Sequence, residues 1–238
     1  MTSQPPGAKE RHHGSVCTGR GSRILEQVEE QYEPALAVIR NHPFVQGVAQ
    51  GTVPLAILRQ FAHAEYWYMR GGVKHFALSI MVAPDLETQR FYHQRLSGEL
   101  EYLERFRPFL HALGLAEEVL DRSWPAPRTL SAVNFLFRLS IEGGPADKAI
   151  AWFVVGRVFA ETCRAMREGF ARHYQLPAAA LHFFDIPHVH SGPFVDAIAT
   201  IIARYAPSAQ DRAHLQQVVE AIVAYEQEFY DALMAPTA

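Results

Sequence analysis

Apolar residues recur every three or four positions over most of the chain, which is the spacing of one face of an α-helix. No segment shows the alternation of apolar and polar residues that is typical of a half-buried strand. The pattern therefore predicts an all-α bundle of seven or eight helices. The predicted helices span about residues 23–41, 52–82, 86–113, 130–141, 146–174, 194–205 and 211–234.

The ends of the chain differ in character. Residues 1–22 are polar, rich in glycine, proline and serine, and without helical period, so we expect a flexible N-terminal head. Residues 23–238 form the predicted single helical domain. Proline and glycine mark the breaks between its helices, and His182 to Pro193 is predicted to be an irregular connection.

Composition narrows the classes of function. The 238 residues are 49% hydrophobic and 20% charged, which is ample for a core. The net charge of −3 argues against nucleic acid or an anionic membrane surface as a partner. No apolar run is long enough to span a membrane, and no secretory signal is present. Two cysteines, Cys17 and Cys163, give no disulfide framework, so we expect a cytoplasmic protein. With nucleic acid and membrane surfaces disfavoured, we expect its partner to be a small molecule.

Three glutamates lie where the helical pattern places the core. Glu65 is centred among apolar residues of its predicted helix, as are Glu99 and Glu226 on theirs. Burying an unpaired carboxylate costs several kcal/mol, so each must be protonated, paired, or bound to a ligand or metal. Each can be a structural acid, and Arg95 on the Glu99 face could pair with it. Several carboxylates in one apolar cavity are more typical of a functional site.

Other candidates have weaker patterns behind them. Glu161 lies opposite the main apolar stripe of its helix and faces inward only if that helix is buried on both sides. Tyr68 shares the face of Glu65 and could place its hydroxyl in a pocket. Asp185 and His188, in the irregular connection, could supply a ligand pair or a polar pocket wall, or be solvated. Cys163 sits on an apolar stripe and is interpreted as core.

Several stretches resemble a known family. They are His42-Pro43-Phe44-Val45 before Gly51, Phe61-x-x-x-Glu65-Tyr66-x-Tyr68, Gly98-Glu99-Leu100, and Tyr225-Glu226-Gln227-Glu228-Phe229-Tyr230. In order and spacing they resemble the haem-oxygenase-like helical superfamily, which includes TenA (thiaminase II), pyrroloquinoline quinone synthase and the haem-oxygenase-like di-iron oxidases. The resemblance covers about residues 24–235 and implies a haem-oxygenase-like bundle. Relatives often form dimers or tetramers, so it also implies a homo-oligomer.

The TenA resemblance implies roles for particular residues. Glu65 stands where a TenA acid holds the aminopyrimidine, Tyr68 matches the neighbouring pocket tyrosine, and Glu226 matches the late catalytic glutamate. The nucleophilic cysteine of TenA should fall near residues 155–157 and is missing; one subclass has a glutamate in that region, which Glu161 could represent. The predicted catalytic residues are Glu226, Glu65 and Glu161. The predicted substrate contacts are Phe61, Tyr68, Glu99, Tyr102, Asp185 and His188.

Three hypotheses follow. The first is a metal-free, TenA-like enzyme that hydrolyses a C–N bond of an amine or aminopyrimidine, with buried glutamates as proton shuttles. The second is a non-haem iron oxidase or oxygenase, in which the resemblance to the di-iron oxidases implies iron ligands. Those ligands would be Glu65, Glu99, Glu161, Asp185 and His188. The third is a non-catalytic member that binds a small ligand or a partner protein.

Overall fold

The computed structural model describes residues 11–186 and 192–235, which contain ten α-helices, two short 3-10 helices and no strand. The all-α prediction is therefore confirmed, and eight of the α-helices have eight or more residues. Within these residues no helix is long and apolar enough to cross a membrane. The α-helices are α1 (Arg11–Arg40), α2 (Pro43–Gln50), α3 (Leu55–Met81), α4 (Leu86–Ala112), α5 (Glu117–Leu120), α6 (Ser131–Glu142), α7 (Pro145–Arg172), α8 (Ala178–Leu181), α9 (Pro193–Tyr205) and α10 (Ala209–Met234). The 3-10 helices are Pro127–Leu130 and His182–Phe184.

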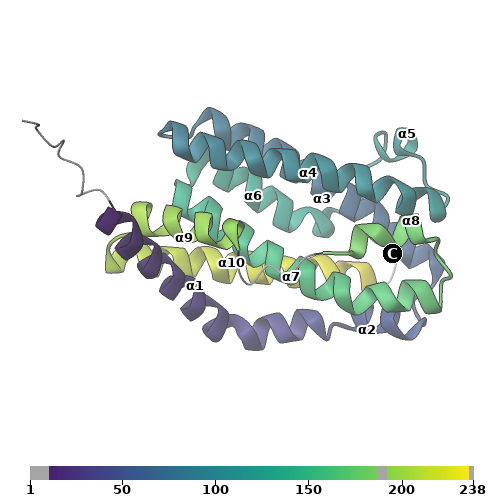
Figure 1. Ribbon diagram of the computed structural model, residues 1–238. Coiled ribbons are helices and arrows are strands. Elements are labelled where there is room, and N and C mark those ends of the chain that lie inside the picture. Colours follow the sequence, from purple (N-terminus) through teal and green to yellow (C-terminus); the bar gives the residue numbers. More distant parts are fainter. Residues whose placement is uncertain (1–10, 187–191, 236–238) are drawn as a thin grey trace, which may run out of the picture.

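Helix α7 is the centre of the bundle. Helices α3, α4 and α6 form one side and α1 and α2 the other, while α7, α9 and α10 lie between them (Figure 1). Accordingly α7 contacts α1, α2, α6, α9 and α10. Its sequence is apolar nearly all round in the first half, which is typical of a helix buried on more than one side. The bundle thus turns faces of α3, α4, α7 and α10 toward a common interior.

Helix α2 was not predicted from the sequence. It is too short to display a helical period, and its N-cap is a histidine rather than one of the usual capping residues. The Nδ1 atom of His42 accepts a hydrogen bond from the backbone N–H of Phe44 at 3.1 Å. The other ring nitrogen lies 3.0 Å from Oδ1 of Asp231 on α10. A contact from the far end of the chain therefore fixes a cap that local sequence does not reveal.

Helix α1 begins at Arg11 rather than near Arg23, so residues 11–22 of the predicted flexible head are helical. The reason is tertiary contact. At Gly21, a Cβ atom would lie 1.8 Å from the carbonyl oxygen of Ala199 on α9. Helix packing of this closeness overrides the poor helix propensity of a glycine-rich segment. The division of the chain into a head and one domain otherwise stays a prediction.

Gly71 and Gly98 offer a matched test of helix packing, because both lie inside long helices. A Cβ on Gly71 would be 1.9 Å from Cγ2 of Val133 on α6, whereas a Cβ on Gly98 would meet nothing within 4 Å. We expect Gly71→Ala to lower the free energy of unfolding by about 1–3 kcal/mol through overpacking. Gly98→Ala should raise it by about 0.5–1 kcal/mol. Urea unfolding followed by circular dichroism measures both; equal stabilities would contradict the α3–α6 contact.

Candidate functional site

Three glutamates from three helices form the centre of the candidate site. Glu65 on α3, Glu99 on α4 and Glu226 on α10 are all buried, with 7%, 7% and 5% of their surfaces exposed. The predicted inward orientation of each is therefore confirmed. Gly72, two turns after Glu65, is where Glu99 approaches α3: a Cβ there would lie 3.1 Å from Oε2 of Glu99.

All three carboxyl groups have raised pKa values, and that of Glu65 also reflects its proximity to the other two. Burial, together with the charges of Glu226 and Glu99, raises the pKa of Glu65 to about 8. Burial raises the pKa of Glu99 to about 7, against the opposing charge of Arg95. The pKa of Glu226 is also raised to about 7 by burial, against the lowering effect of a hydrogen bond from Tyr68. Carboxyl groups with such pKa values can both donate and accept protons at neutral pH.

Tyrosine hydroxyls complete the polar interior. The Tyr68 hydroxyl donates a short hydrogen bond to Oε1 of Glu226, which joins α3 to α10. The Tyr230 hydroxyl lies 3.1 Å from Oγ1 of Thr162, and burial followed by the charge of Glu65 raises its pKa. Tyr230 was not predicted as a site residue. Its position one turn after Glu226 on the same face was the signal that could have identified it.

Arg95 connects the acids to the start of α9. Its Nη2 atom is 3.7 Å from Oε1 of Glu99, which is too long for a direct hydrogen bond. Its guanidinium carbon is 4.2 Å from the centroid of the Phe194 ring, in the first turn of α9. The expected Arg95–Glu99 pair is thus present, but as a loose electrostatic contact.

Cys163 and Tyr102 border the acids. Burial, and then the charge of Glu65, raise the pKa of the Cys163 thiol well above its usual value. Cys163 is a buried core residue as predicted, and it also lies within electrostatic reach of Glu65. Burial also raises the pKa of Tyr102, and the charge of Glu99 raises it as well. The Tyr102 ring packs edge-on against Phe159.

Phe61 forms part of an aromatic wall. Its ring packs edge-on against Phe229, with centroids 6.3 Å apart. Phe229 in turn packs edge-on against Tyr68. Phe61 therefore supports the tyrosine that holds Glu226.

Glu161 does not join this group. It faces α1, where Nη1 of Arg40 lies 2.6 Å from its Oε2, and Nη2 of Arg157, one turn earlier on α7, lies 3.3 Å from its Oε1. The sequence could not distinguish the two faces of α7, because both are covered. Paired with two arginines, Glu161 has the contacts of a structural acid.

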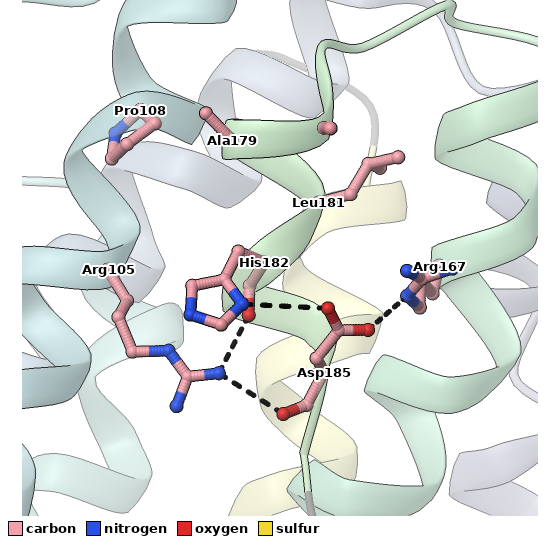
Figure 2. A pocket seen from close by; sticks show the side chains of 8 residues that line it. Arg105, Pro108, Arg167, Ala179, Leu181, His182 and Asp185 are labelled. Atoms are coloured by element: carbon pink, nitrogen blue, oxygen red, sulfur yellow. Dashed lines mark hydrogen bonds and ion pairs between the residues drawn. The ribbon is translucent and has the colours of Figure 1, made fainter.

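Asp185 also lies elsewhere. It lines a pocket of about 500 Å³ with Arg105, Arg167 and His182 (Figure 2). Arg167 on α7 donates a short hydrogen bond to its carboxylate, and this bond lowers the Asp185 pKa. Nη2 of Arg105 on α4 donates to its carbonyl oxygen at 3.1 Å. Asp185 is thus engaged by arginines, and His188 lies outside the described residues.

The structure brings together only part of the set of residues expected for iron. In the described part of the chain, no three His, Cys, Asp or Glu side chains are arranged to hold a metal ion. Of the expected ligands, Glu161 and Asp185 are engaged by arginines, and His188, the expected nitrogen donor, lies outside the described residues. Among the described residues, Glu65 and Glu99 alone are an incomplete ligand set for a non-haem iron centre.

The model of the TENA/THI-4/PQQC family matches residues 29–235. The chain belongs to this family. Its relatives include an aminopyrimidine aminohydrolase of Halalkalibacterium halodurans, 27% identical over 50% of this chain and 53% of the relative. A second, from Staphylococcus carnosus, is 29% identical over 43% of this chain and 46% of the relative. The chain therefore spans about half the length of these relatives in the matched regions.

Solved structures of other proteins share the fold. A TenA homologue from Pseudomonas syringae pv. tomato has a TM-score of 0.75 at 16% identity, over 88% of this chain and 91% of that one. A domain with a haem-oxygenase-like fold from Shewanella denitrificans has a TM-score of 0.70 at 17% identity, over 89% and 90%. At these identities the likeness establishes the fold, and the predicted haem-oxygenase-like bundle is confirmed.

Burial of protonated carboxyl groups in this family member predicts a pH dependence of stability. Glu65 has an ordinary pKa near 4.5 and a folded-state pKa of about 8, so the folded state binds more protons between these values. Stability should therefore fall as pH rises from about 4.5 to about 8. Since one pKa unit corresponds to about 1.4 kcal/mol, we expect the Glu65 contribution to be at most about 5 kcal/mol.

Glu65→Gln removes this titration, so its free energy of unfolding should fall less between pH 5 and pH 8.5 than that of the wild type. Denaturant titrations across this range measure the slope. Glu101→Gln is the control, since Glu101 is exposed on α4, and it should keep the wild-type slope. A Glu65→Gln slope equal to that of the wild type would contradict burial of a protonated Glu65.

Proposed function

We propose that this protein is a C–N hydrolase that releases ammonia from an aminopyrimidine. The observation that carries the proposal is the buried Tyr68–Glu226 hydrogen bond beside Glu65, in a chain of the TENA/THI-4/PQQC family. Relatives named aminopyrimidine aminohydrolase support the substrate class and the reaction.

Glu65 suits the recognition of an aminopyrimidine ring. Such a ring presents an amino group that donates hydrogen bonds next to a ring nitrogen that accepts them. A protonated carboxyl group can donate to the nitrogen and accept from the amino group at the same time. The raised pKa keeps Glu65 protonated at neutral pH, which favours this two-point contact over an ion pair with a free amine.

Glu226 suits proton transfer. In the hydrolysis, a water oxygen forms a bond to the carbon that carries the amino group, the C–N bond breaks, and the nitrogen leaves as ammonia. The attacking water gives up one proton and the leaving nitrogen takes one. A carboxyl group with a pKa near 7 can perform both transfers in turn, and the Tyr68 hydroxyl fixes the orientation of its carboxylate.

A cysteine nucleophile is not part of this proposal. The Cys163 thiol is buried beside Glu65, and both effects disfavour the thiolate that would attack carbon. Direct attack by water, with the glutamates as proton carriers, needs no thiolate. No observation favours the iron-dependent alternative. A non-catalytic member would bind the ring in the same site without releasing ammonia.

Two glutamates of α10, Glu226 and Glu228, test the role of Glu226. We expect Glu226→Gln to lower the rate of ammonia release from 4-aminopyrimidines by about 10²–10⁴-fold, since general acid–base catalysis contributes this much. Glu228→Gln should change it less than about threefold, because Glu228 contacts Arg128 on the surface. A coupled assay for ammonia gives both rates. Binding of the pyrimidine without ammonia release by the wild type would favour the non-catalytic alternative.

Cys163→Ala tests for a nucleophilic thiol. We expect the variant to retain at least about a third of wild-type kcat, because the thiol stays protonated in this environment. A thiol-reactive reagent should likewise leave wild-type turnover unchanged. A loss of 10²-fold or more in kcat, with thermal unfolding unaltered, would place the thiol in the mechanism.

We also propose a cytoplasmic location and a small-molecule partner. The small number of cysteines and the absence of a basic tract in the sequence support these two proposals. Sedimentation of the purified protein would test the homo-oligomer expected from family resemblance.

A further inference from the structure

A second group of buried polar side chains adjoins the three glutamates. It consists of His75 on α3, Tyr92 on α4, and Lys148 and Trp152 on α7, each at most 6% exposed. None of the four has a role in the proposed hydrolysis. Burial of so many hydrogen-bonding groups in a helical core requires partners.

Three of these side chains have an atom without a partner. Nδ1 of His75 lies 2.7 Å from the carbonyl oxygen of Leu136 and must carry a proton, so Nε2 is left as an acceptor with nothing bound. Nε1 of Trp152 and the hydroxyl of Tyr92 also have no partner among the described residues. A buried polar atom left without a hydrogen bond costs about 1–3 kcal/mol, and three such atoms together indicate a missing ligand group.

Lys148 adds a cation to the group. Its ammonium nitrogen lies 5.9 Å from the centroid of the Tyr92 ring, and it forms no ion pair with the described residues. Asp147 is the nearest source of negative charge, but its carboxylate accepts from the backbone N–H of Gly144 at 2.8 Å and lies 3.3 Å from His214. Burial lowers the pKa of Lys148, and the charge of Asp147 acts against this shift. An anion beside Lys148 would stabilise its charged form.

Trp152 joins this group to the glutamates. A Cβ on Gly72 would lie 3.0 Å from Cη2 of Trp152 and 3.1 Å from Oε2 of Glu99, so both side chains meet at Gly72. The ring centroids of Trp152 and His75 are 5.5 Å apart. Lys148 precedes Trp152 by four residues on α7, a rise of about 6 Å. Glu99 and the six-membered ring of Trp152 thus both lie beside Gly72, and Lys148 lies about one helical turn before Trp152 on α7.

We propose that His75, Tyr92, Lys148 and Trp152 form a subsite for an anionic oxygen group, a carboxylate or a phosphate, carried by the aminopyrimidine. Lys148, Trp152 and Tyr92 supply donors to its oxygens, and Nε2 of His75 can accept from a protonated phosphate oxygen. The inference rests on the proposed function, since the glutamates hold the ring. The substrate is then bipolar, with a basic ring at one end and an acidic substituent at the other.

Isothermal titration calorimetry with three ligands tests this. The ligands are 4-aminopyrimidines whose 5-substituent ends in a carboxylate, a phosphate or a neutral amide. We expect the wild type to bind at least one anionic ligand ten or more times tighter than the amide. Lys148→Met should abolish that preference and leave amide binding unchanged, whereas Lys74→Met, at an exposed position of α3, should keep it. The carboxylate and phosphate arms distinguish the two anions.

Tyr92→Phe keeps the ring and removes only the unpartnered hydroxyl, so it serves if Lys148→Met does not fold. It should weaken the preferred anionic ligand three-fold or more without affecting the amide. Equal binding of all three ligands by the wild type, or an anion preference unchanged in Lys148→Met or Tyr92→Phe, would overturn the subsite and leave the proposed hydrolase intact. Failure of every aminopyrimidine to bind would overturn both.

Discussion

The burial of three carboxyl groups between helices is the constraint on which the site depends. Glu65, Glu99 and Glu226 come from three separate helices, so their proximity exists only when the bundle is packed. Once packed, they are partly protonated at neutral pH, because burial raises all three pKa values and the charges of Glu226 and Glu99 also raise that of Glu65. The interior therefore holds carboxyl groups that can donate or accept protons, and aromatic rings enclose them. That property suits a reaction in which water loses a proton and a nitrogen gains one.

Much of the fold and the centre of the site could be predicted from the sequence. The angular positions of Glu65, Glu99 and Glu226 placed each acid on an apolar face, because helical period alone fixes that relation. The same test failed for Glu161, because α7 is covered on both sides and its second face is lined by Arg40. Helix α2 escaped prediction for a related reason, since its cap relies on Asp231 from the other end of the chain.

The second polar group could not be predicted at all. Lys148 and His75 carry no motif, and a lysine or histidine in a helical pattern is ordinarily solvated. What marks them is the lack of partners after folding, which is a property of the packed core and not of the sequence. The contrast with Asp185 is instructive: the sequence favoured Asp185, but two arginines engage it at a surface pocket. The presence or absence of bonding partners in the folded chain, rather than the residue type, distinguishes Asp185 from Lys148 and His75.

Gly72 has a consequence for how this molecule can change. Because Gly72 has no side chain, Glu99 and Trp152 can both pack against it. The acidic group and the proposed anion subsite therefore both border on Gly72. A substitution that enlarges this position would displace both side chains at once. Under the proposed subsite, binding of the ring and binding of the anionic substituent then change together. We expect a relative with a bulkier residue at this position to bind a shorter ligand. Libraries aimed at new substrates should therefore vary Gly72, Glu99 and Trp152 together.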